Sequence, residues 1–118
     1  MKVNDTVDKD VDIVPFTITS GQSTSPAIIV YGATMVFFQT PAVLTNATIT
    51  FQGSIDGGKT FAPVRDINGN LISYTVITNA AGLYNMNAQT FVGLDQIKFV
   101  MSGTEAADRT FALKAFAI

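Results

Sequence analysis

Two turns contain a carboxylate within a pattern that could indicate chemistry. The first, residues 54–61 (SIDGGKTF), places an aspartate before a pair of glycines. A carboxylate at this position can accept hydrogen bonds from the amides of its own turn, and paired glycines adopt the positive φ that a tight reversal needs. We therefore predict a stabilising hairpin and no active site here. Its residues are Ser54, Asp56, Gly57, Gly58, Thr60 and Phe61, with the phenylalanine as the anchor beneath the turn.

The second turn, residues 66–70 (DINGN), begins like a calcium-binding loop. A full loop needs more oxygen ligands and a glutamate after the glycine, but the only glutamate, Glu105, lies far along the chain. Asp56, Asp66 and Asp95 could supply two carboxylates for glycoside hydrolysis, although each falls in a separate predicted turn. The chain has no histidine and no cysteine, so the commonest bases and metal ligands are missing. We expect no catalytic residue, no metal ligand and no cofactor, and hence no enzyme.

The pattern S-x-D-x-G-x-T-F in residues 54–61 resembles the Asp-box of sialidases and related propellers. In that family the motif is structural and is repeated from blade to blade, whereas here it occurs once. A sialidase also holds its substrate carboxylate with three arginines, and this chain has two, Arg65 and Arg109. The resemblance implies a stabilised hairpin and no glycosidase.

Charge is scarce in this sequence. Of its 118 residues, 47% are hydrophobic and 14% are charged, against about 25% charged in an average soluble domain. An uncharged polar surface costs less to desolvate, so it favours packing against other proteins. The alternative is a monomeric domain with a polar, uncharged coat.

The distribution of charge disfavours two classes of partner. Residues 1–12 contain four aspartates and two lysines, and residues 13–118 carry five acidic and five basic groups. Because no basic patch or stripe is present, we expect no nucleic-acid partner. No apolar run approaches the roughly 18 residues of a membrane span, so we expect no membrane partner, and no secretion signal is visible.

Short runs of alternating apolar and polar residues, separated by frequent turn signals, predict strands. They indicate an all-β fold: a single, jelly-roll-like β-sandwich of eight or nine short, mainly antiparallel strands. The sandwich would span residues 13–118, and Pro15, which lacks a backbone donor, would put the first strand at a sheet edge. Residues 1–12 would form an extended acidic arm, either frayed or ordered on a neighbouring subunit.

Two predicted strands, residues 35–38 and 109–118, carry apolar residues on both faces. One face of each must fill the core, and the other would stay exposed in a monomer, as contact surfaces do. Which face points outward stays open at this stage. As a hypothesis we assign the contact surface to Val36, Phe38, Phe116 and Ile118.

A longer set of segments resembles small virion proteins of tailed phages. The segments are GATMVF (32–37), PA (41–42), ITFQGSIDGGKTF (49–61), DINGN (66–70), FVG (91–93), IKFVMSGT (97–104) and AADRTF (106–111). The chain departs from the family pattern at Leu94, where tryptophan or alanine is typical. The family pattern consists of strand and turn residues, so it brings no catalytic residue with it.

The resemblance implies a structural component of the virion, made in the host cytoplasm. The expected function is to bind the capsid exterior as a decoration or cement protein and to stabilise it without covalent bonds. The expected partners are the major capsid protein or other virion proteins, with the chain present as a homo-oligomer or in many copies. The alternative is a tail or fibre adsorption module that binds glycans of the host surface.

Overall fold

The computed structural model describes residues 11–31 and 33–117, and these form nine strands and one short helix. The elements are β1 (Val11–Ile18), β2 (Ile28–Ile29), β3 (Ala33–Gln39), β4 (Thr48–Ser54), β5 (Ala62–Pro63), β6 (Ser73–Thr75), β7 (Leu83–Asn85), α1 (Ala88–Phe91), β8 (Gln96–Met101) and β9 (Arg109–Ala117). The predicted all-β class is confirmed. Within these ranges, no helix has the length and apolarity to cross a membrane.

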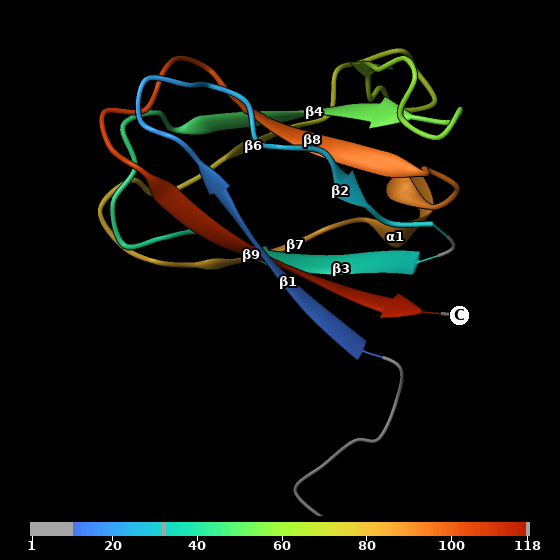
Figure 1. Ribbon diagram of the computed structural model, residues 1–118, viewed down its shortest axis with the longest axis horizontal. Helices are drawn as coiled ribbons and strands as arrows, with labels where there is room; N and C mark the ends of the chain where they lie inside the picture. The colour runs from blue at the N-terminus through green and yellow to red at the C-terminus, as the bar shows by residue number, and fades with distance from the viewer. Residues whose placement is uncertain (1–10, 32, 118) are drawn as a thin grey trace, which may run out of the picture.

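The strands form two antiparallel sheets that pack face to face (Figure 1). One sheet has the order β1-β9-β3-β7, and the other has the order β2-β8-β4-β5 with β6 also on β4. Because β5 pairs with residues 52–53 and β6 with residues 48–50, the two short strands follow each other along one edge of β4. Apart from the run β4-β5-β6, successive strands alternate between the sheets. This order agrees with the predicted jelly-roll-like sandwich.

The first strand lies at the edge of its sheet, as Pro15 predicted. Pro15 lies opposite Ala112 of β9. Because proline has no N–H to donate, it fits this position only if its backbone nitrogen points away from β9, toward the free edge of the sheet. The strand begins at Val11, so Val11 and Asp12, which the sequence assigned to the arm, pair with β9. Residues 1–10 lie outside the described part of the chain, and the arm stays a prediction.

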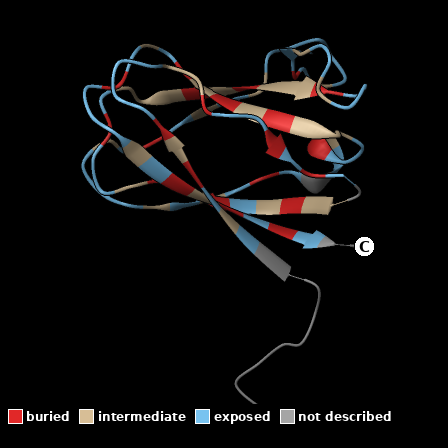
Figure 2. Ribbon diagram, viewed as in Figure 1, coloured by how far each residue is buried: buried red, intermediate tan, exposed pale blue. Residues whose placement is uncertain are grey.

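The core between the sheets is built on aromatic rings. Five phenylalanines are at most 1% exposed: Phe38, Phe51, Phe91, Phe99 and Phe111. The Phe51 ring lies 4.9 Å from Phe99 and 5.0 Å from Phe91, both edge to face, which is an arrangement that aromatic quadrupoles favour. Buried positions alternate with half-buried or exposed ones along the long strands, as Figure 2 shows. The alternation of apolar and polar residues in the sequence therefore corresponds to one buried face on each sheet.

A β-bulge in β3 overturns one prediction about the contact surface. Met35 pairs with Ala115 and Phe37 with Lys114, so Val36 is an extra residue that β9 does not match. The extra residue turns Phe38 into the core, where it is 0% exposed, and Phe37 outward, where it is 36% exposed. Phe38 therefore belongs to no contact surface. Its ring meets four others, at 5.2 to 6.3 Å: Phe51, Tyr74, Tyr84 and Phe99.

Truncation of Phe37 and Phe38 tests whether the bulge turns Phe38 into the core and Phe37 outward. We expect Phe38→Ala to lower the free energy of unfolding by ~3–5 kcal/mol, because it opens a cavity among packed rings. The control Phe37→Ala removes an outward ring from the same strand and should cost ~1 kcal/mol or less. Chemical denaturation monitored by tyrosine fluorescence or circular dichroism measures both values. Equal losses in the two variants, or a larger loss for Phe37→Ala, would contradict the bulged register.

Candidate functional site

The predicted hairpin forms a loop of residues 55–61 between β4 and β5, held by its own aspartate. Asp56 Oδ1 accepts hydrogen bonds from the amides of Lys59 (3.1 Å) and Thr60 (3.0 Å). It also accepts one from the Ser54 hydroxyl (2.7 Å), and Oδ2 accepts one from the Thr60 hydroxyl (2.6 Å). The bonds from Thr60, followed by that from Ser54, lower the pKa of Asp56 to about 2. Both carboxylate oxygens are thus occupied by groups of the loop itself.

The aromatic residue of this loop lies elsewhere than we expected. Phe61 is half-buried and is not part of the core. Its ring faces the Lys98 ammonium, whose nitrogen lies 4.1 Å from the ring centroid, a cation–π geometry. Phe61 therefore fixes the loop against the outer side of β8, and its truncation removes a surface contact instead of opening a core cavity.

The three aspartates considered for catalysis lie in two regions. Asp95 joins the hairpin, since its Oδ2 accepts a hydrogen bond from the Gly57 amide (2.9 Å). Asp66 lies in its own turn, where Oδ1 accepts bonds from the amides of Asn68 and Asn70 (both 2.9 Å). The geometry there is that of a closed turn with Gly69 at φ 81°. Within residues 11–31 and 33–117, no three acidic, histidine or cysteine side chains gather as a metal site would require.

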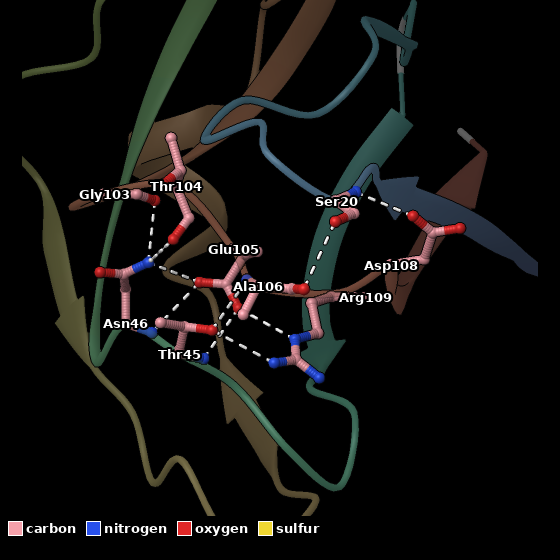
Figure 3. A network of polar contacts seen from close by, with 9 residues as sticks. All are labelled: Ser20, Thr45, Asn46, Gly103, Thr104, Glu105, Ala106, Asp108 and Arg109. Carbon is pink, nitrogen blue, oxygen red and sulfur yellow. Dashed lines mark hydrogen bonds and ion pairs between the residues drawn. The ribbon is translucent and has the colours of Figure 1, made fainter.

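A buried carboxylate that the sequence did not single out ties together one end of the sandwich (Figure 3). The Glu105 side chain is 0% exposed and forms an ion pair with Arg109 at 3.0 Å. Its two oxygens also accept hydrogen bonds from the Thr45 amide (2.8 Å), the Asn46 amide (3.1 Å) and the Asn46 side chain (2.7 Å). The connection between β3 and β4 is thereby fixed to the loop between β8 and β9.

The backbone of the same residue reaches a third loop. The Glu105 carbonyl accepts a bond from the Gly21 amide (2.8 Å), and its amide donates to the Gln22 carbonyl (2.9 Å). Burial acts to raise the pKa of Glu105, but the bonds from Thr45, Asn46 and Arg109 outweigh burial and lower it below the usual value. Glu105 is therefore ionised at neutral pH, and donors from Thr45, Asn46 and Arg109 hold its carboxylate. This is a structural site, since no part of the carboxylate is open to a substrate.

The outer face of the sheet β1-β9-β3-β7 exposes a group of large apolar side chains. Ile13 and Leu83 are 68% and 67% exposed, and Phe37 and Phe116 are 36% and 37% exposed. The register explains why they share a face: Lys114 faces Ile13 on one side and Phe37 on the other. A shallow groove of about 260 Å³ runs across this face. It is lined by Ile13, Phe37, Gln39, Leu83, Ala112 and Lys114.

The structure places two of the four predicted contact residues near this face. Phe116 lies on it, two positions beyond Lys114 in β9, and Val36 is half-buried at the bulge. Phe38 is in the core, and Ile118 lies outside the described residues. Sequence reasoning missed Ile13, Phe37 and Leu83. The alternation of β1 could have found Ile13, because Val14, Phe16 and Ile18 already occupy the inner face.

The fold has a counterpart among solved structures. The SPBc2 prophage-derived protein YomS aligns with 95% of this chain and 99% of its own, with a TM-score of 0.55 and 18% sequence identity. At that identity the likeness shows a shared fold. A chain from the structure "Bacillus endospore appendages form a novel family of disulfide-linked pili" aligns over 95% of this chain and 93% of its own. Its TM-score of 0.34 and identity of 11% are too low to indicate a shared fold. No protein-family model matches the chain, and no curated protein matches its sequence.

Neutralising Glu105 should destabilise the protein and change how its stability depends on pH. At neutral pH we expect Glu105→Gln to cost about 2 kcal/mol or more, because Arg109 would keep a buried charge without its partner. The folded pKa lies below the unfolded value of 4.5, so the contribution of Glu105 is present above pH 4.5 and is lost as the pH falls through the folded pKa. The variant should therefore lose less stability than the wild type over that acidic range.

Urea denaturation across a pH series measures this effect. The matched control is Asp108→Asn, which changes an exposed carboxylate of the same loop and keeps the oxygen that accepts the Ser20 amide. We expect that control to follow the wild-type curve at neutral pH. If Glu105→Gln were as stable as the wild type at pH 7, the carboxylate would not be the tie between the loops.

Proposed function

We propose that this protein is a structural component of a phage virion that binds the capsid exterior as a decoration protein and stabilises it. The observation that carries the proposal is the apolar outer face of the sheet β1-β9-β3-β7. A contiguous apolar surface of this kind is typical of protein contact sites. Each Å² of apolar surface removed from water there contributes ~25 cal/mol.

The side chains of this face indicate what surface the partner would present. Lys114 is the one charged side chain that lines the groove, and it lies between apolar neighbours. Its ammonium would need an acceptor on the partner once water is excluded. The matching surface on a capsid subunit is therefore flat and apolar, with a carboxylate or free carbonyl opposite Lys114. The rest of the contact would depend little on charge.

Two further observations support a virion role. The sequence segments described above resemble small virion proteins of tailed phages, and the protein that shares the fold over 95% of this chain is prophage-derived. The way the loops are held also fits a protein that binds without catalysing a reaction. Glu105 and Asp56 hold the loops at the two ends of the sandwich, and both carboxylates are occupied by structural hydrogen bonds.

Attachment in many copies follows from the size of the face. Four strands about 4.8 Å apart span roughly 19 Å, and the nine residues of β9, at about 3.3 Å each, span roughly 30 Å. The flat area of the face, roughly 570 Å², is therefore smaller than the ~800 Å² that each partner contributes to a standard interface. Single contacts would be weak, and multiple copies on a particle or additional contacts from residues 1–10 would complete the attachment. The protein would then be located in the virion.

Placing a charge on the apolar face should prevent attachment. We expect Ile13→Asp or Leu83→Asp to weaken binding to particles produced without this protein by roughly 30-fold or more. The reason is that an unpaired carboxylate in an apolar contact costs ~2 kcal/mol or more. The matched controls are Ile55→Asp and Ile67→Asp, which change isoleucines that are 81% and 100% exposed in loops away from the face. Cosedimentation with the particles measures the bound fraction. Equal binding by all four variants would rule out this face as the contact surface.

Salt should have little effect on the attached protein. Screening weakens exposed charge pairs and leaves apolar contacts intact, and the face carries one lysine among apolar and amide side chains. We expect the bound fraction to stay constant when decorated particles are washed through a rising series of sodium chloride concentrations. Release at moderate salt would show that charge holds the complex, and the apolar contact model would fail.

A further inference from the structure

A second hollow lies at the other sheet, beside the turn of residues 66–70. It consists of two adjoining pockets of about 400 and 440 Å³ that share Asp66, Asn87 and Thr90 as lining residues. The two pockets are therefore parts of one groove, which runs between the segment 65–74 and the segment 87–91. None of its lining residues lines the apolar groove of the first sheet. Volumes of this order are those of small-molecule sites.

The side chains shared by the two pockets carry hydrogen-bonding groups that the fold leaves open. Asp66 uses Oδ1 for the amides of its turn, and among the described residues no group donates to Oδ2. Asn87 uses Oδ1 to accept the Gln89 amide (3.1 Å), so its two amide hydrogens can donate. The Thr90 hydroxyl, which has no partner among those residues, can both donate and accept. The groove thus offers acceptors and donors side by side.

One end of the groove has an apolar floor. Leu71, Ile72 and Tyr74 line it, and the isoleucine and tyrosine are half-buried and packed against the core. The Tyr74 hydroxyl donates to the Asn85 carbonyl at 2.8 Å, which fixes the position of the ring. An apolar floor below polar walls suits a ligand with C–H groups on one face and hydroxyl groups at its rim.

The charges around the groove select a neutral ligand. Arg65 and Asp66 both line it, and their charges cancel. The Arg65 guanidinium also donates to the Gly69 carbonyl at 3.1 Å, which holds it at the turn. A singly charged ligand would be attracted by one of these two groups and repelled by the other. Hydroxyl groups, which donate to a carboxylate and accept from an amide or a guanidinium, avoid both penalties.

We propose that this groove binds a neutral saccharide of one or two units. Asp66 and Asn87 would bind adjacent hydroxyls, Thr90 would bind a third, and the C–H face of the ring would lie on Leu71 and Tyr74. The inference does not depend on the apolar face or on the proposed function. Contact with the capsid and binding of a sugar would involve separate surfaces of the same domain.

Saccharide binding can be tested directly on the full chain. The probe is a panel of neutral mono- and disaccharides of glucose, galactose, mannose and their N-acetylated amines, first immobilised and then free in solution. We expect at least one to bind saturably, with changes in amide chemical shift confined to residues 65–74 and 87–91. If no sugar of the panel bound above background, the proposal would be overturned.

Two conservative variants test the location. Asp66→Asn keeps the Oδ1 acceptor that the turn needs and removes the charge, and Thr90→Val removes the hydroxyl at almost constant volume. We expect each to weaken binding about tenfold, the effect of losing ~1.4 kcal/mol. The control Asn68→Ala changes an exposed residue of the same turn that does not line the groove, and it should bind as the wild type does.

A loss of binding counts as evidence only for a variant that is still folded. Thermal melting shows which variants keep the wild-type stability. If Asp66→Asn were destabilised, the conclusion would be drawn from Thr90→Val. Binding that both folded variants retain in full would place the sugar elsewhere and overturn the proposal.

Discussion

The β-bulge at Val36 is the constraint on which both the core and the exposed face of the first sheet depend. A regular β3 would place Met35 and Phe37 on one side and Val36 and Phe38 on the other. The extra residue lets Met35 and Phe38 both enter the core, at 1% and 0% exposure. The carbonyl of the bulged residue is paired, because it accepts a hydrogen bond from the Met86 amide at 2.9 Å. The same shift turns Phe37 to the outside, where it becomes part of the apolar face.

The two ends of the sandwich are stabilised in the same way, by one carboxylate that accepts hydrogen bonds from several loop groups. Asp56 does so within a single loop and is exposed, whereas Glu105 joins three loops and is buried. Removing the buried carboxylate would cost more than removing the exposed one, since Arg109 would be left with a largely buried charge and no partner.

The scarcity of charge has a structural consequence in this fold. Of the ten charged residues in 13–118, Glu105 and Arg109 neutralise each other, Lys98 lies over an aromatic ring and Asp56 is held by its loop. The outer face of the first sheet keeps a single lysine in its groove. In the proposed contact, such a surface would rely on shape and apolar burial more than on charge.

The sequence by itself determined the fold class, the edge position of β1 and the structural nature of the hairpin turn. These depend on local physics: alternation with a period of two, the missing donor of Pro15, and the hydrogen bonds of an aspartate with its own loop. The tertiary structure decided three features: which face of β3 points outward, the burial of Glu105 and the groove beside Asp66. A bulge arises from the register of β3 against β9, and a buried ion pair and a groove arise from loops far apart in the chain. No single stretch of residues contains that information, because each feature is a contact between stretches.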